Sequence, residues 1–454
     1  MKNKYNIKDE TMLSLGEIHI FSYNGNQLAW LVDKSILIQM TTIIFDIINS
    51  FDTSLSLKEL TKKLYNKYDS IEIYDIVSEL IKLNALIDQT ELQEKKTINH
   101  INFYTNSLTL ILTDKCNLNC IYCFENNKNE PEKKESMTLE TAKNAIDTLF
   151  KYSLKEDPLN ILFFGGEPLL KIKTINQLFY YSLDKAYANN KQIHFTITTN
   201  GTLLNENNIK FLNKTKMSVL LSIDGGLDEQ NFNRPFRNGQ TYNKSLEENI
   251  AKFVKNRPYP TTARVTCTKN NMILINFIPK LVDMGFKEIQ IFPAIKKGIK
   301  DLEINIDEFI LEYEKLLDTG LVEYINHYQN LKDILENKKY SINFCGALIR
   351  QITVRPDGKI YICPVLAGDK SFLIGNVNEQ FISNNQIEKI RKGGKFLHNN
   401  KSCDLCWARY ICRGGCIAER LFLEGNIYNT NQTLCKLTKK IIELNLGYYY
   451  RKNS

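Results

Sequence analysis

Short apolar runs alternate with longer stretches of helical spacing through the middle of the chain. The runs, bounded by polar residues, are typical of buried strands, and the stretches between them repeat apolar residues along one helix face. Repeated strand–helix units predict a parallel sheet with right-handed crossovers. The predicted strands span residues 108–112, 160–164, 193–198, 219–223, 263–268 and 288–292, with helices between them, for example at 139–152 and 249–256.

The first hundred residues follow a different pattern. Two strand-like runs, 17–23 and 27–33, are joined by Asn24-Gly25, a pair typical of tight hairpin turns. Three helical stretches follow, at 36–51, from the capping box Ser56-Leu57-Lys58-Glu59 to about residue 68, and at 73–86. Strands followed by three helices predict a winged helix–turn–helix unit.

Two further regions complete the predicted organisation. Residues 301–340 are rich in Glu, Lys, Leu and Tyr and predict one or two amphipathic linking helices. The stretch 354–361 predicts a β-hairpin with an Asp357-Gly358 turn. The expected domains are therefore 1–100, 101–300, 301–340 and 341–454.

Composition and charge narrow the class of protein. The 454 residues are 43% hydrophobic and 24% charged, which is ordinary for globular proteins. The net charge is +8, without a long basic tract, and residues 1–100 hold eleven lysines and no arginine against fourteen acidic residues. A duplex-binding surface needs basic residues, so we expect no nucleic-acid partner for the winged unit.

The targeting signals of other compartments are not found in the sequence. The first ten residues are polar and lack an apolar signal core, and no apolar run approaches the ~20 residues of a membrane span. We therefore expect a cytoplasmic protein with no membrane partner. In that compartment eleven cysteines favour metal binding over disulfides.

Three cysteines lie on the loop that follows the first predicted strand of the parallel sheet. Cys116, Cys120 and Cys123 have the spacing C-x3-C-x2-C. Three thiolates on one loop can hold three irons of a [4Fe–4S] cluster and leave the fourth iron without a protein ligand. The alternatives are a zinc loop or three reduced core thiols. Cys267 lies apart, in the run 263–268, and is predicted to be a buried thiol.

This spacing, with Tyr122 before the last cysteine, resembles the radical S-adenosylmethionine (SAM) superfamily. The resemblance implies an α/β fold, a partial (β/α)6 barrel, in which a [4Fe–4S] cluster binds and reduces SAM. The SAM is then cleaved to a radical that removes hydrogen from the substrate. A reducing protein, flavodoxin or ferredoxin, would supply the electron.

Polar and glycine-rich segments follow four of the predicted strands. Gly165 and Gly166 permit a close backbone approach, and Glu167 can hold an ammonium group. The resemblance implies that this segment binds the methionine amino group of SAM. It places the other contacts at Tyr122 on the adenine, at Ser222 and Asp224 on the ribose, at Asn200, and at Arg264 on the carboxylate or ribose. Each of these segments alone could be a turn, Tyr122 could be core packing, and Arg264 could form a structural ion pair.

Seven cysteines in the last third of the chain resemble the SPASM extension of peptide-modifying radical SAM enzymes. The resemblance assigns Cys345, Cys363 and Cys416 to a first auxiliary [4Fe–4S] cluster, and Cys403, Cys406, Cys412 and Cys435 to a second. That makes three clusters in all. No cysteine lies between Cys345 and Cys363, where some relatives carry a fourth ligand, so an open iron there could bind a substrate thiolate, a water or another side chain. A zinc knuckle could begin at Cys403, but seven thiolates do not divide into fours.

The N-terminal unit resembles the peptide-recognition (RRE) domain of enzymes that modify ribosomally made peptides. In that family a leader peptide adds a strand to a sheet edge, expected here near residues 28–32; an inert cap is the alternative. The resemblance implies a maturase that forms thioether crosslinks in a precursor peptide. Alternatives are carbon–carbon or carbon–oxygen crosslinking, a non-enzymatic iron–sulfur or zinc regulator, or an anaerobic sulfatase maturase, although Pro364 stands where that family has an aspartate.

Overall fold

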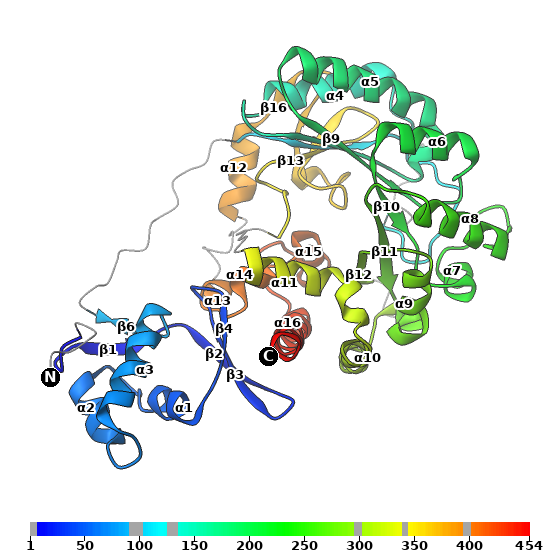
Figure 1. The fold of residues 1–454 in the computed structure, drawn as a ribbon. Helices are drawn as coiled ribbons and strands as arrows, with labels where there is room; N and C mark the ends of the chain where they lie inside the picture. The colour runs from blue at the N-terminus through cyan, green and yellow to red at the C-terminus, as the bar shows by residue number, and fades with distance from the viewer. Residues whose placement is uncertain (1–6, 90–102, 125–134, 295–301, 338–343, 394–400) are drawn as a thin grey trace.

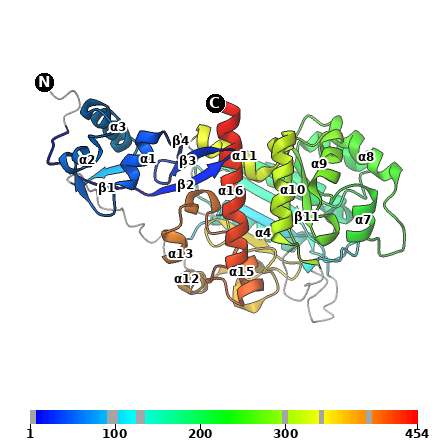
Figure 2. The same cartoon turned by 90° about the horizontal axis from the view of Figure 1, so that it is seen from below.

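The computed structural model describes residues 7–89, 103–124, 135–294, 302–337, 344–393 and 401–454. A small N-terminal unit lies at one side of the molecule, and a curved sheet with helices on its outer face forms the largest part (Figure 1). The long helix α16 (Gln432–Asn453) lies between these two parts (Figure 2).

A ten-stranded sheet organises the larger part. Its order is β12-β11-β10-β9-β8-β7-β13-β14-β15-β16, and neighbours from β7 to β12 are all parallel. The six parallel strands are β7 (Ser107–Ile111), β8 (Leu159–Phe164), β9 (Ile193–Thr199), β10 (Ser218–Ser222), β11 (Thr261–Cys267) and β12 (Ile289–Pro293). All six predicted strands are thus confirmed to within two residues, because each is a buried apolar run that reads clearly in the sequence.

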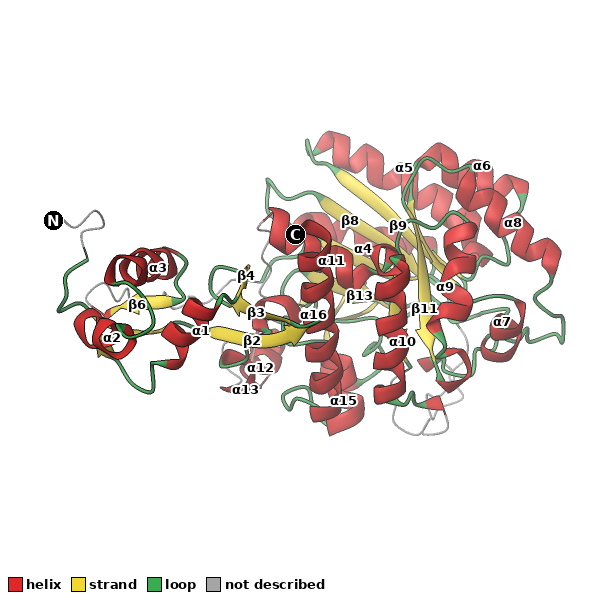
Figure 3. Ribbon diagram, turned by 60° about the horizontal axis from the view of Figure 1, so that its bottom comes forward, coloured by secondary structure: helices red, strands yellow, loops and turns green. Residues whose placement is uncertain are grey.

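Amphipathic helices cover the outer face of this sheet (Figure 3). They are α4 (Leu139–Lys151), α5 (Ile172–Ala188), α6 (Glu206–Thr215), α7 (Leu227–Asn233), α8 (Lys244–Lys255) and α9 (Leu274–Asp283). Their apolar stripes and the strands form one continuous core, in which Leu110, Phe163 and Ile197 are fully buried. Cys267 belongs to this core, which confirms the predicted buried thiol.

The C-terminal third extends the same sheet. β13 (Gln351–Val354) pairs in parallel with β7, and β14 (Lys359–Tyr361), β15 (Leu373–Asn376) and β16 (Phe381–Ile382) continue in antiparallel fashion. The predicted hairpin is confirmed: Val354 pairs with Ile360, and Gly358 takes the positive φ of 83° that its turn requires. Short helices follow, at α12 (Asn384–Gly393), α13 (Lys401–Asp404), α14 (Arg409–Cys412) and α15 (Ile417–Glu424).

The region between barrel and C-terminal segment is helical, as predicted. It contains α10 (Ile306–Thr319) and α11 (Asn326–Asn337), and both pack against α16. Of the helices in the described ranges, none is both long and apolar enough to span a membrane.

The N-terminal unit contains two small sheets and three helices. The hairpin of β2 (Ile18–Tyr23) and β3 (Asn26–Leu31) turns at Asn24 and Gly25, both with positive φ, as predicted. A second sheet joins β1 (Met12–Leu15) to β5 (Leu55–Ser56) and β6 (Leu86–Asp88). The capping box at Ser56 and Glu59 opens α2 (Leu57–Leu64), and α3 (Ser70–Lys82) follows from the N-cap Asp69.

Two expectations for this unit are wrong. Residues 36–51 are not one helix: β4 (Ile36–Gln39) precedes α1 (Thr42–Asn49), whose N-cap Thr41 interrupts the apolar run. The edge for an added strand is not at residues 28–32, because β3 is the central strand, paired with β2 on one side and β4 on the other. The available edges are therefore β2 and β4.

Candidate functional site

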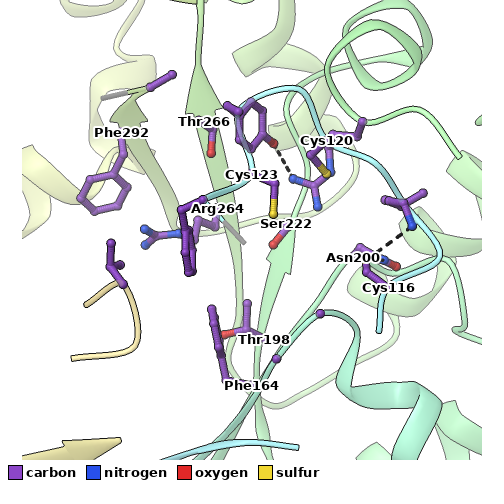
Figure 4. A pocket seen from close by; sticks show the side chains of 18 of the residues that line it. Cys116, Cys120, Cys123, Phe164, Thr198, Asn200, Ser222, Arg264, Thr266 and Phe292 are labelled. Atoms are coloured by element: carbon purple, nitrogen blue, oxygen red, sulfur yellow. Dashed lines mark hydrogen bonds between the residues drawn. The ribbon is translucent and has the colours of Figure 1, made fainter. Parts of the chain in front are cut away.

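A cavity of 710 Å³ opens at the carboxyl ends of the parallel strands, and the three cysteines of the first loop line it. Figure 4 shows Cys116, Cys120 and Cys123 around the same space as Ser222, Arg264 and Phe292. The size is within the usual range for small-molecule sites, about 300–1,000 Å³. Ligand-binding groups thus gather where parallel strands end, as the sequence predicted.

The two glycines after β8 press directly against the cysteine loop. A Cβ on Gly165 would lie 2.5 Å from the Thr113 carbonyl oxygen, and one on Gly166 would lie 2.2 Å from that of Lys115. The Gly166 N–H donates to Thr113 at 2.7 Å, and the Glu167 N–H donates to Lys115 at 2.9 Å. Both glycines line the cavity, but the closest approach they permit is between two parts of the chain.

Glu167 lies beneath the surface of the cavity and holds a residue that lines it. Its side chain is fully buried; one carboxylate oxygen accepts from the Leu169 N–H and the Thr199 hydroxyl, and the other accepts from the Asn200 N–H at 2.8 Å. Glu167 is not among the residues that line the cavity, whereas Asn200 is. The Asn200 amide donates to Asn117 at 2.9 Å and to the Cys116 sulfur at 3.8 Å. Glu167 therefore fixes the residue that contacts the cysteine loop.

Tyr122 and Asp224 are joined in a buried network that also contains Arg234. The Tyr122 hydroxyl donates to Asp224 at 2.5 Å and accepts from Arg234 at 2.5 Å. The other Asp224 oxygen accepts from the Thr266 N–H at 3.0 Å. Burial raises the pKa of the Asp224 carboxyl, and the positive charge of Arg234 opposes that increase. Tyr122 lines the cavity and Asp224 does not, so Asp224 acts on the site by holding Tyr122.

Two charged side chains from different parts of the chain, Arg264 and Glu419, line the cavity. Arg264, on β11, lies 4.4 Å from the ring centre of Phe292, and burial lowers the pKa of its guanidinium. Glu419, on α15, lines the cavity beside Cys416; burial raises the pKa of its carboxyl to about 7, with Arg264 opposing. Neither Glu419 nor Arg234 was predicted from the sequence, because neither belongs to the segments that directly follow the predicted strands.

A buried ion pair connects the cysteine loop to the C-terminal hairpin. Arg355 lies 3.2 Å from Asp114, the residue two before Cys116, and both line the cavity. The C-terminal region therefore closes one side of the same cavity that the barrel opens.

The seven C-terminal cysteines fall into two spatial groups. Burial, with a contribution from Cys345, raises the pKa of the Cys363 thiol to about 11. Burial also raises the pKa of the Cys416 thiol, and Cys363 and Cys345 both contribute to that increase. In the other group, burial raises the pKa of the Cys412 thiol to about 12, with contributions from the remaining members, which are Cys403, Cys406 and Cys435. These electrostatic contacts are compatible with the two sets that the sequence resemblance implies, and the assignment of each set to a cluster stays a prediction.

The donor chemistry of all three cysteine groups fits iron–sulfur clusters. The cysteines are free thiols, and backbone N–H groups such as that of Leu118, 3.4 Å from the Cys116 sulfur, are suited to thiolates. Within the described ranges no three His, Cys, Asp or Glu residues converge on a single ion. A [4Fe–4S] cube places each cysteine on a separate iron, so its ligands are spread more widely than those of one ion.

Comparison with known families agrees with this geometry. Residues 110–276 match the family model described as the radical SAM superfamily. This segment contains the three cysteines of the first loop, the end of β7 and the whole of β8, β9, β10 and β11.

Several characterised and uncharacterised proteins resemble longer parts of the chain. An uncharacterised protein of Methanocaldococcus jannaschii is 33% identical over 290 residues, 63% of this chain and 93% of its own. The radical SAM cyclopropyl synthase TigE of Paramaledivibacter caminithermalis is 25% identical over 440 residues, 89% of each chain. A cysteine-type anaerobic sulfatase-maturating enzyme of Clostridium perfringens is 26% identical over 358 residues, 74% of this chain and 90% of its own.

Solved structures share the fold. The enzyme anSMEcpe with bound AdoMet superposes with a TM-score of 0.63 at 24% identity, over 76% of this chain and 97% of that one. Streptococcus suis SuiB bound to its precursor peptide SuiA superposes with a TM-score of 0.52 at 14% identity. The match covers 93% of this chain and 99% of the SuiB chain. The family model, the relatives and the cysteine-lined cavity lead to one conclusion: the chain belongs to the radical SAM superfamily and is a radical SAM enzyme, a class that uses a [4Fe–4S] cluster and SAM.

Proposed function

We propose that the protein modifies a ribosomally made precursor peptide and forms a thioether between a cysteine sulfur and a carbon of another residue. The observation that carries the proposal is the position of Cys416, which lines the same cavity as Cys116, Cys120 and Cys123. A substrate thiolate held near Cys416 would then lie beside the place where SAM reacts.

The chain's own residues would act as follows. Cys116, Cys120 and Cys123 would hold the core cluster, and the two C-terminal groups would hold two auxiliary clusters. SAM bound at the core cluster would supply a 5′-deoxyadenosyl radical to take one hydrogen atom from the substrate carbon. The substrate thiol would lose its proton as the carbon–sulfur bond forms, and the auxiliary clusters would take up the surplus electron. Tyr122, Ser222 and Arg264 line the cavity and would orient SAM, while Phe292 and its apolar neighbours would exclude water. Flavodoxin or ferredoxin would supply the electron.

The N-terminal unit would recognise the leader segment of the precursor. One edge strand of its sheet, β2, packs against α16, which leaves β4 as the edge for an added peptide strand. The solved SuiB complex contains a precursor peptide, and its fold covers the same N-terminal region of this chain.

Carbon–carbon bond formation is the second candidate. TigE, described as a cyclopropyl synthase, aligns over 89% of this chain, a share too large to leave out the whole N-terminal unit. The sulfatase-maturating relative aligns over 74% of this chain, and Pro364 stands directly after Cys363 where the maturases need an aspartate. Formylglycine formation is therefore less well supported than either crosslink.

Co-expression tests the proposal. The enzyme would be produced anaerobically with each short open reading frame encoded beside it, and the peptide mass measured intact and after thiol alkylation. A thioether removes two hydrogens and consumes one alkylatable thiol, whereas a cyclopropane removes two hydrogens and leaves every thiol free. The Cys120→Ala variant is the matched negative control. Unchanged peptide mass with intact SAM cleavage would contradict peptide modification.

A further inference from the structure

The second auxiliary cysteine group does not rest on the C-terminal domain alone. One face of the β2–β3 hairpin carries Phe21, Leu28, Trp30 and Val32 and is buried in a common core with Ala408, Ile442 and Leu446. Cys406, Trp407 and Cys412 pack against this core. Figure 2 shows the hairpin running up to α16. Strand alternation explains the arrangement, since the opposite face of the same hairpin packs against α1.

Polar and aromatic contacts also join the β2–β3 hairpin to α16 and to the segment that contains Cys406. The His19 ring stacks on Trp407 with ring centres 3.7 Å apart and 3° between the planes, and its Nε2 lies 2.8 Å from a Glu443 carboxylate oxygen. On the same strand, β2, Tyr23 packs so closely on α16 that a Cβ on Gly447 would lie 2.2 Å from its ring. Both ends of β2 are therefore fitted to segments near the end of the chain.

Arg409 is the centre of the charged contacts. Its side chain is only 7% exposed, and it forms ion pairs with Asp33, at 3.0 Å, and with Glu17. Its other terminal nitrogen donates to the Cys406 carbonyl oxygen at 3.3 Å. Arg409 thus links the acidic ends of the hairpin to the backbone of a cysteine in the second group. A buried guanidinium left without its carboxylate partners destabilises the folded state. The folded protein therefore keeps Arg409 paired with the hairpin.

We propose that the β2–β3–β4 sheet is a wall of the second auxiliary centre and that His19 and Arg409 are positioning residues for its cysteine segment. The proposal rests on the proposed function, in which Cys403, Cys406, Cys412 and Cys435 hold a cluster. The wall covers the side of Cys406 and Cys412, while Leu405, between two of the cysteines, is 84% exposed on another side. Peptide bound to the N-terminal unit would therefore act directly on the environment of this centre.

The test compares iron release from anaerobically purified protein. His19→Ala and Arg409→Gln should release iron to a chelator roughly 10-fold faster than the parent, as expected when a supporting contact of a metal site is lost. They should also shift the reduction potential of one auxiliary signal. Arg451→Gln is the matched control. Arg451 is on the same helix as Cys435, α16, but its ion pair with Asp318, at 3.6 Å, lies away from the cysteine group. Arg409→Lys should restore part of the effect.

A double variant assigns the effect to the second centre. With Cys412→Ala already present, Arg409→Gln should no longer change iron release, because the centre it supports is gone. Release and potential equal to the Arg451→Gln control in both single variants would overturn the inference. If the parent itself binds iron for only one cluster, the proposed three-cluster arrangement fails instead. If Arg409→Gln does not fold, His19→Ala decides the question.

Discussion

The loop with Cys116, Cys120 and Cys123 and the C-terminal group of Cys403, Cys406, Cys412 and Cys435 are held in place in opposite ways. The core loop is fixed by the backbone of the barrel: the Asn119 N–H donates to Pro235, the Ile121 N–H donates to Asn233, and the two glycines after β8 press against its start. The second group lies on short helices and a long terminal one, and side chains from the N-terminal hairpin cover it.

The difference shows what each centre depends on. Backbone contacts with the segments that follow β8 and α7 come with the barrel fold, so the core loop is positioned where these segments of the barrel form. The second group depends on contacts between segments more than 370 positions apart, such as Asp33 with Arg409. We therefore expect changes in the barrel to affect SAM chemistry, and changes in the hairpin to affect only the auxiliary centre.

Removing one cysteine from each centre gives the largest expected contrast. In Cys120→Ala, 5′-deoxyadenosine formed from SAM under strong reductant should fall more than about 100-fold, beyond the loss expected from residues that merely support a ligand. In Cys412→Ala, SAM cleavage without peptide should continue at the parent's level, although iron content falls. The measurement is 5′-deoxyadenosine by chromatography, with iron determined on the same samples. Equal losses in both variants would show that the two centres are not independent.

The Tyr122–Asp224–Arg234 network should matter more to stability than any surface ion pair. Asp224→Asn leaves Arg234 buried without its carboxylate, and loss of one partner of a buried pair costs about 3–5 kcal/mol. The matched control is Asp147→Asn, whose partner Lys185 at 2.6 Å is partly exposed and should cost no more than about 1 kcal/mol. Thermal unfolding of the anaerobic holoproteins measures both. Similar midpoints for the two variants would contradict a structural role for the network.

The same contrast explains which features could be read from the sequence. The six parallel strands and the core cysteine loop are contiguous patterns, and the structure places them together as predicted. β4 was missed because its apolar residues run into those of α1, and the edge prediction failed with it. Arg234 and Glu419 reach the cavity only through the tertiary fold, so no local pattern could have marked them. The ligand roles of the cysteines remain predictions.

Adding one methyl group at Gly166 tests whether the core cysteine loop depends on the backbone of the barrel. A Cβ there would lie 2.2 Å from the Lys115 carbonyl oxygen, so Gly166→Ala must displace the cysteine loop at a cost of about 1–3 kcal/mol. Gly239→Ala is the control, because its Cβ would meet nothing within 4 Å, and its cost is limited to the strain of the positive φ of 78°, about 1–2 kcal/mol. Core iron content and SAM cleavage should fall in Gly166→Ala and not in the control. Unchanged iron in Gly166→Ala would mean that the loop can move without loss of its ligands.

His327 should give a smaller, pH-dependent effect at the junction of barrel and helices. Its ring lies 6.5 Å from those of Phe292 and Tyr313, its Nδ1 is enclosed and makes no hydrogen bond within the described residues, and burial lowers its pKa to about 4. Because the unfolded state binds a proton near pH 6.5 and the folded state does not, stability is full above that pH and falls as the pH drops toward 4. Between pH 7 and pH 5 the loss should be about 2 kcal/mol. His327→Asn should remove this acid sensitivity, whereas His194→Asn, at an exposed position, should not. Thermal midpoints that fall equally with pH in the parent and in His327→Asn would show that the buried ring does not titrate in this way.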